Sequence, residues 1–361
     1  MKRALCLLVP LVLAAACSHG TTKAGPTPTP TGSPSPTATQ AVTPISPPTP
    51  STHPTTVPVG PAGTKVPTRF RPQSATFISS RTGWALGSSP CPSGKGSCDV
   101  IARTRDGGAT WLAIPSPKTS PDHLAHIRFA DPANGFITGD QLWATHDGGG
   151  TWKAVPESQG IGELATSGGR VWVNQNGVVK SAAVTGGAFT TTRNAFRAQD
   201  LRVRGAVVVT SDTNGRLYRL VQGGFTVVRT PCQGGQVPVA GLGSGHWLLV
   251  CAGDAGLGHE EKHAFRSTDS GSTWTPAGDP PQQSGTDSYV TSDGDFVVDH
   301  LEVAVSRSGS WQVALSTDGG VSEGGFESAD LGYCIGGFGG STDQTMKITH
   351  DAGRTWKSVA F

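Results

Sequence analysis

Charged side chains are scarce in this chain of 361 residues. Asp, Glu, Lys and Arg together make up 15% of it, and the formal net charge is only +2. The few Lys and Arg residues do not gather into a basic stripe, so binding to nucleic acid through counterion release has little to act on. We therefore expect no nucleic-acid partner.

The chain also has little that would form long apolar helices. The apolar run from residue 4 to residue 16 spans 13 residues, whereas a membrane-spanning helix needs about 20. Lys2 and Arg3 come directly before this run, which is the order found in a signal peptide. Gly (50 residues) and Pro (27 residues) are abundant, and they make long helices in the rest of the chain improbable.

Three small residues, Ala14 to Ala16, lead directly to Cys17. This junction resembles a bacterial lipobox, in which the cysteine receives a diacylglycerol before cleavage, although Ala14 stands where Leu is commonest. The resemblance implies that residues 1–16 are a lipoprotein signal peptide. Cys17 would then be the lipidated residue, anchored to the outer face of the cell membrane. The alternative is secretion without an anchor, because Ala14-Ala15-Ala16 also satisfies the small-x-small cleavage rule.

Residues 17–65 are expected to form a linker. From Gly20 onward this segment is nearly all Thr, Pro, Ser, Ala, Gly and Val, with too few bulky apolar side chains to bury a core. Such a chain favours extended conformations of ~3.1 Å per residue, so it reaches at most about 140 Å. We expect a disordered Pro/Thr/Ser-rich tether with no partner of its own.

Five cysteines follow the lipobox, and export would permit them to form disulfides. Cys91 and Cys98 enclose a short polar loop and are the first candidate pair, Cys232 and Cys251 are the second, and Cys334 is left over. No Cys/His spacing matches a zinc site. We expect neither a metal nor a cofactor.

Four segments share the pattern Ser/Thr-x-Asp-x-Gly-x-Thr-Trp, in which the Asp and Gly shape a tight turn and the Trp closes it. An Asp carboxylate can accept the unpaired backbone N–H groups of such a turn, Gly supplies a positive φ, and Trp packs between sheets. We therefore expect these residues to be structural rather than catalytic. They are Asp106, Gly108 and Trp111; Asp147, Gly149 and Trp152; Asp269, Gly271 and Trp274; and Asp351, Gly353 and Trp356.

This pattern resembles the Asp box, or bacterial neuraminidase repeat, of sialidases and of many non-enzymatic β-propellers. A second pattern, Phe followed six residues later by Gly-aromatic, precedes three of the boxes at Phe77, Phe129 and Phe326. The combination is similar to the propellers of the photosystem II assembly-factor family. The resemblance implies a β-propeller and says little about the ligand.

The spacing of the tryptophans predicts the number of blades. Trp111 and Trp152 are 41 residues apart, Trp152 and Trp274 are 122 apart, and Trp274 and Trp356 are 82 apart. These intervals fit one, three and two steps of about 41 residues, the length of a four-stranded blade. Weaker turns at 186–189, 223–225 and 308–311 fill the missing steps.

We therefore predict an all-β fold, a single propeller of seven four-stranded blades over residues 66–361. Six or eight blades are the alternatives if a degenerate repeat is misassigned. The ring could close by packing alone or through an edge strand from Thr68 to Arg71.

Two classes of function remain open. The first is a non-catalytic, monomeric envelope scaffold that binds a protein or a glycan through long loops on the face opposite the Asp boxes, among them Ser88–Ser97 and Ala252–His263. The second is an exo-acting, sialidase-like glycosidase. Three substrate-clamping arginines and a Tyr nucleophile would be needed, for which Arg71, Arg204, Arg307 and Tyr289 can be nominated but no motif selects them.

His259 to His263 match the zinc-protease pattern H-E-x-x-H. That pattern binds zinc when a helix places both histidines on one face. The flanking glycines and the Asp box that follows instead predict a solvated loop between the second and third strands of blade five.

Overall fold

Short antiparallel strands make up the computed structural model of the protein. It describes residues 60–361 except 118–123, 234–235, 244, 257–258, 282–286, 291–293, 300, 308, 329 and 338–343. The expected signal peptide, Cys17 and nearly all of the expected linker lie outside the described residues. Within the described residues, no helix is long and apolar enough to cross a membrane.

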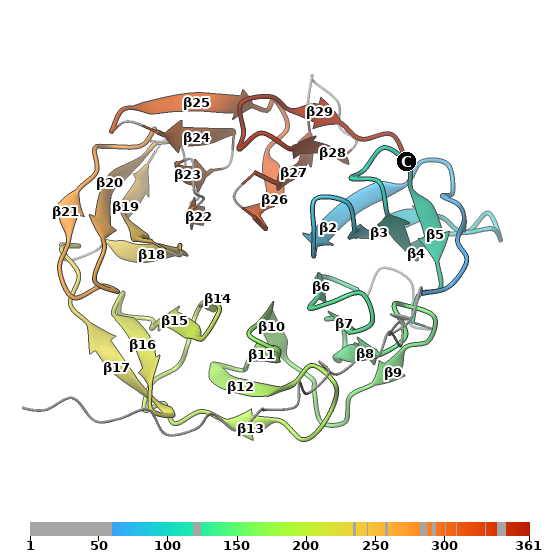
Figure 1. Ribbon diagram of the computed structural model, residues 1–361, viewed down its shortest axis with the longest axis horizontal. Helices are drawn as coiled ribbons and strands as arrows, with labels where there is room; N and C mark the ends of the chain where they lie inside the picture. The colour runs from blue at the N-terminus through green and yellow to red at the C-terminus, as the bar shows by residue number, and fades with distance from the viewer. Residues whose placement is uncertain are drawn as a thin grey trace, which may run out of the picture. The chain divides into compact units, whose positions relative to one another are not determined.

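The strands form seven antiparallel sheets arranged around a common centre, so the predicted seven-bladed propeller is confirmed (Figure 1). Each blade has four strands in chain order from the centre outward, and blade 1 has a fifth. The first three blades comprise β2 (Arg71–Phe77), β3 (Gly83–Pro90), β4 (Ser97–Thr104) and β5 (Leu112–Ile114); β6 (Ile127–Phe129), β7 (Gly135–Ile137), β8 (Trp143–Thr145) and β9 (Lys153–Ala154); β10 (Ile161–Ser167), β11 (Arg170–Gln175), β12 (Val178–Ala183) and β13 (Thr190–Thr191).

The last four blades follow the same order. They comprise β14 (Arg202–Arg204), β15 (Val207–Ser211), β16 (Leu217–Val221) and β17 (Gly224–Val228); β18 (Val237–Leu242), β19 (Trp247–Gly256), β20 (His259–Ser267) and β21 (Thr275–Pro276); β22 (Asp287–Val290), β23 (Asp295–Val298), β24 (Glu302–Ser306) and β25 (Trp311–Ser316); β26 (Val321–Phe326), β27 (Gly332–Gly337), β28 (Gln344–Thr349) and β29 (Lys357–Ser358).

The hydrophobic core is divided among the seven interfaces between neighbouring blades. Each interface has its own cluster of buried side chains, because the two faces of a propeller sheet are both covered by another sheet. Between blades 1 and 2, for example, the rings of Trp84 and Phe129 stack with their centroids 3.7 Å apart. The stability of the ring is therefore spread around its circumference.

The four segments 104–111, 145–152, 267–274 and 349–356, called the repeat turns below, join the third and fourth strands of blades 1, 2, 5 and 7. In the first, Asp106 Oδ1 accepts a hydrogen bond from Thr110 N (2.9 Å), Asp106 Oδ2 accepts one from Thr110 Oγ1 (2.6 Å), and Thr104 Oγ1 accepts one from Gly108 N (2.8 Å). The Thr110 hydrogen bonds lower the pKa of Asp106 to about 2. Asp147, Asp269 and Asp351 make the same bonds in their own turns.

Tryptophan side chains tie successive blades together. The indole N–H of Trp152 in blade 2 donates to Pro115 O, just after blade 1, at 3.0 Å. Trp274 in blade 5 donates to Arg229 O, after blade 4, at 2.9 Å. In these two repeats the Trp packs as an apolar side chain and also satisfies a carbonyl just after the neighbouring blade, whereas Trp111 donates to Gly108 O of its own turn at 3.1 Å.

The ring closes through side chains, because all four strands of blade 7 come from the C-terminal end of the chain. An N-terminal edge strand exists, but it is β1 (Thr64–Lys65), which pairs with β5 on the outer edge of blade 1. Arg71, in contrast, begins the innermost strand of that blade. At the seam between blades 7 and 1, Phe361 packs edge-on against Phe70 with centroids 4.6 Å apart.

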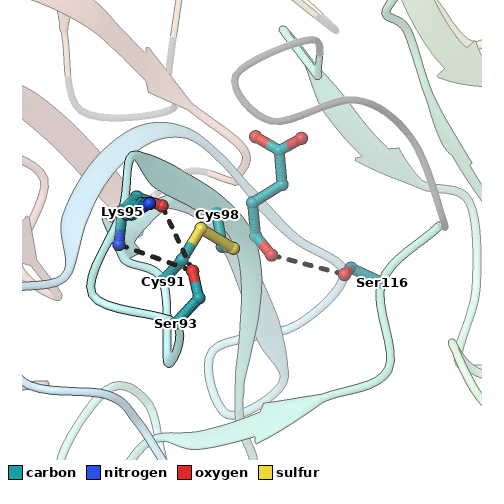
Figure 2. The surroundings of a disulfide bond; sticks show 6 residues. Cys91, Ser93, Lys95, Cys98 and Ser116 are labelled. Atoms are coloured by element: carbon teal, nitrogen blue, oxygen red, sulfur yellow. Dashed lines mark hydrogen bonds between the residues drawn. A yellow bond between two sulfur atoms is a disulfide. The ribbon is translucent and has the colours of Figure 1, made fainter.

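Two disulfides hold long hairpins of the propeller. Cys91 and Cys98 close the tip of the β3–β4 hairpin, where Ser93 and Lys95 hydrogen-bond to each other (Figure 2). Cys232 and Cys251 link the segment before β18 to β19. These are the two pairs proposed from the sequence, and Cys334 is free and buried.

Candidate binding site in the central cavity

The first strand of every blade contributes to a cavity of about 290 Å³, the central cavity, enclosed by the ring. Several titratable side chains lie in its wall, which is unusual for strands that are otherwise apolar. The lining includes Arg128, Glu163, Arg202, Arg204, Tyr289, Glu327 and Tyr333.

Glu323 on β26 joins three blades at one edge of this wall. Its Oε1 accepts hydrogen bonds from Ser74 Oγ (3.0 Å) and Ala75 N (3.2 Å) on β2, and from Tyr333 OH (2.7 Å) on β27. Ser74 Oγ in turn accepts a hydrogen bond from the backbone N–H of Ile127 on β6 (3.2 Å). One carboxylate therefore connects blade 7 to blade 1 and, through Ser74, to blade 2.

The charge of Glu323 is also compensated from blade 2. Arg128 Nη1 lies 3.3 Å from Oε1, and His126 Nδ1 lies 3.2 Å from Oε2. Burial by itself raises the pKa of Glu323, but the positive charge of Arg128 and the hydrogen bonds outweigh it and lower the pKa to about 2. Glu323 is thus ionised and committed to holding the seam.

A second ion pair crosses from blade 4 to blade 6. Arg202 Nη2 contacts Asp287 Oδ1, and the Asp287 charge holds the pKa of Arg202 above its ordinary value. Beside this pair, the Tyr289 hydroxyl donates a hydrogen bond to the carbonyl of Gly324. Burial raises the pKa of Tyr289 far above its ordinary value, so this hydroxyl stays protonated.

Two charged side chains of the cavity wall are not held by an ion pair or a hydrogen bond, and they are called uncommitted below. The side chains of Glu163 on β10 and Arg204 on β14 form no hydrogen bond or ion pair with any residue that the structure describes, and both line the cavity. Burial raises the pKa of Glu163, and the nearby charge of Arg202 opposes this. Glu327 lies in the same wall, and burial, opposed by Arg128, raises its pKa to about 7. A ligand that carries both charges and backbone-like polar groups could pair with these side chains.

Of the residues nominated for a glycosidase, the structure brings only Arg204 and Tyr289 to the cavity. Arg71 pairs with Ser88 in blade 1. Arg307 donates to the carbonyl of Ala352 at 2.6 Å and does not line the cavity. The three nominated arginines therefore do not form a carboxylate clamp.

Sequence reasoning missed most of the charged wall. Arg128, Glu163, Arg202, Glu323 and Glu327 belong to no local motif, and each lies in or directly after the first strand of a blade. The signal available in the sequence was the alternation of apolar and charged residues along a strand. Ile127 and Phe129 point into the interface with blade 1, so Arg128 lies on the other face of the strand.

The prediction of a loop at Ala252–His263 was wrong, because β19 and β20 extend into this segment and pair there as a long hairpin. His259 to His263 lie on β20, where side chains alternate, so the H-E-x-x-H pattern has strand geometry rather than the helical geometry that zinc proteases need. His263 hydrogen-bonds to Asp279 (2.9 Å) and Glu261 (3.0 Å), and these bonds raise its pKa. Within the described part of the chain, no three His, Cys, Asp or Glu side chains are grouped to hold a metal.

No protein-family model and no curated protein sequence matches the chain. Its fold is similar to that of YCF48 bound to a D1 peptide, with a TM-score of 0.56, 16% identity and coverage of 80% of this chain and 96% of that one. The fold is also similar to the propeller domain of the Trilobed protease from Pyrococcus furiosus, which has an open velcro topology. The TM-score is 0.58, the identity is 6%, and the match covers 81% of this chain and 96% of that one. For acylaminoacyl peptidase from Pyrococcus horikoshii the TM-score is 0.56 and the identity is 7%, and the match covers 78% of this chain and 52% of that one. At these identities the similarity concerns the fold alone.

Proposed function

We propose that the protein is an exported lipoprotein, anchored through Cys17, whose propeller is a non-catalytic scaffold that binds a segment of an envelope protein at the central cavity. The observation that carries the proposal is the pair of uncommitted charges, Glu163 and Arg204, in a cavity where Arg128 and Arg202 are held in ion pairs. Charged side chains in a partly enclosed wall that lack a directly contacting partner are costly unless a ligand pairs with them.

An extended peptide fits this wall well. A peptide presents side chains of both signs together with N–H and C=O groups, which match one carboxylate and one guanidinium on the first strands of the neighbouring blades 3 and 4. The YCF48 structure, which shares the fold, contains a bound peptide. A glycan would offer hydroxyls but no cation for Glu163.

The geometry gives the glycosidase alternative little support. A tyrosine nucleophile needs an adjacent base to take its proton, whereas the Tyr289 hydroxyl donates to a backbone carbonyl and its pKa is raised. Arg128 and Arg202, which could bind a substrate carboxylate, already pair with Glu323 and Asp287. We expect no turnover of sialosides or other glycosides by the protein.

The proposal is tested by photo-crosslinking in the intact envelope. Ala165, which lines the cavity and makes no side-chain hydrogen bond, is replaced by a small diazirine amino acid in the full-length protein. The control places the same amino acid at Val227, 58% exposed on the outermost strand β17. A discrete protein adduct from position 165 but not from 227 supports the proposal. Adducts of equal yield from both positions, or a glycan adduct at 165, would contradict it.

A further inference from the structure

Blades 5 and 6 meet through one face of β20, on which every second side chain points toward blade 6. Arg266 pairs with buried Asp295, and Ala264 packs into the apolar core of the interface. At the next position outward, Lys262 faces Asp299, which follows β23. Lys262 thus places an amine at the interface between blades 5 and 6.

Lys262 and Asp299 are both fully buried, with 0% of either side chain exposed. Lys262 Nζ lies 3.7 Å from Asp299 Oδ2 and 3.6 Å from Glu260 Oε2 on the same strand. Buried lysines are rare, and separating their charge from water is expensive. The site is a contact between an amine and a carboxyl group that are both inaccessible to solvent.

The two oxygens of Asp299 have different surroundings. Oδ1 accepts hydrogen bonds from the backbone N–H groups of Leu301 (3.1 Å) and Glu302 (2.9 Å). Oδ2, which faces Lys262, is buried and has no hydrogen-bond partner among the described residues. The carboxyl group is therefore fixed by one oxygen and presents the other to the amine.

We propose that Lys262 and Asp299 join spontaneously into an intramolecular isopeptide bond that links blade 5 covalently to blade 6. Because both side chains are fully buried, transfer of a proton from the Lys262 ammonium to the Asp299 carboxylate would replace two buried charges by two neutral groups. Burial also raises the pKa of Asp299, which favours this neutral pair. The amine is then a nucleophile and the acid an acyl donor.

The bond forms by condensation. Nζ attacks Cγ, and the negative charge that develops on Oδ1 is stabilised by the N–H groups of Leu301 and Glu302, as in an oxyanion hole. Glu260 accepts a proton from Nζ and passes it to the Oδ2 hydroxyl, which leaves as water, so Glu260 returns to its starting state. The Nζ–Cγ bond forms, the Cγ–Oδ2 bond breaks and one water is released, so no oxidant, metal or activated donor is required.

Asp299 rather than Glu260 is the acyl donor for two reasons. Asp299 has two backbone donors on the oxygen that must carry the charge. Glu260 is two residues from Lys262 on the same strand and is partly exposed, at 14%, so it is suited to exchange protons rather than to be acylated.

Mass spectrometry tests the bond directly on the full-length protein isolated from its membrane. After reduction, alkylation, unfolding and trypsin digestion, we expect residues 230–266 and 267–307 to appear as one branched peptide, lighter than its two parts by one water. Trypsin should fail to cleave after Lys262 and should cleave after exposed Lys153 in the same digest. Complete cleavage after Lys262, with the linear peptides 230–262, 263–266 and 267–307, would show a simple ion pair and overturn the proposal.

Variants separate the chemistry from folding. Asp299→Asn should give a branched peptide of the same mass as the wild type, because an amide donor loses ammonia in place of water. Lys262→Arg and Asp299→Ala should give only linear peptides, and Glu260→Gln should lower the branched fraction severalfold. A branched fraction unchanged in Glu260→Gln would overturn the role of Glu260, and one that persists in Asp299→Ala would overturn the assignment of Asp299.

Discussion

Replacing Glu323 by Gln removes one charge from the seam where blade 7 meets blade 1. Gln keeps the size of the side chain and one acceptor oxygen, so Ser74, Ala75 and Tyr333 retain an acceptor near its present place. Arg128 loses its counter-charge while remaining in the cavity wall. Because no strand crosses this seam, the loss falls on the contact that closes the ring.

The size of the effect follows from the pKa of Glu323, about 2 in the folded protein and 4.5 as the ordinary value. The side chain is only 11% exposed, and a shift of this size corresponds to about 3 kcal/mol of folding free energy. Since the folded-state pKa is the lower one, this stability is fully present above pH 4.5. It is lost as the pH falls from there toward 2.

Urea unfolding of wild type and Glu323→Gln measures the difference at pH 7, 5, 4 and 3. We expect the variant to be less stable by about 3 kcal/mol at pH 7, with the gap narrowing steadily below pH 5. Glu157→Gln, at an exposed position, serves as the control and should change stability by less than about 0.5 kcal/mol. A gap that does not depend on pH would refute the assignment of the seam to the Glu323 charge.

Three further predictions concern the anchor, a disulfide and a repeat turn. Cys17→Ser should abolish incorporation of labelled fatty acid and release the protein from the membrane fraction; continued labelling would rule out Cys17 as the anchor. Replacing Cys232 and Cys251 together by Ser should lower the unfolding free energy by about 3 kcal/mol, since the bond closes a loop of 19 residues; an unchanged urea midpoint would contradict this. Gly108→Ala should cost about 1–3 kcal/mol, because φ is 93° there and the added Cβ would lie 2.7 Å from Ile348 Cδ1; a neutral urea midpoint would show that the turn adapts.

The blade count was predictable because the turn chemistry is local. Thr104, Asp106, Gly108 and Thr110 satisfy one another within seven residues, so the sequence of one turn carries nearly all the information for that turn. Even the degenerate repeat at 308–311 kept Trp311, whose indole donates to Ala277 O of the preceding blade at 3.0 Å.

The charged wall could not be predicted in the same way. Ser74 and Glu323 are 249 residues apart, and their contact exists only because the seventh blade returns to the first. Lys262 was misassigned to a loop for a related reason: its burial depends on Asp299 in the next blade, and nothing in residues 259–263 indicates that partner. Local patterns therefore predicted the repeats and their number, and the geometry of the ring determines which side chains meet.

Binding at the central cavity is tested most directly by removing the charge of Arg204, one of the two uncommitted side chains, by substitution. The partner that crosslinks to position 165 is quantified after purification of wild type, Arg204→Ala and the matched Arg193→Ala. Arg193 is an exposed residue that follows the outermost strand β13. We expect about a tenfold loss of partner for Arg204→Ala and wild-type recovery for Arg193→Ala. Equal recovery from all three proteins would contradict a binding site in the cavity.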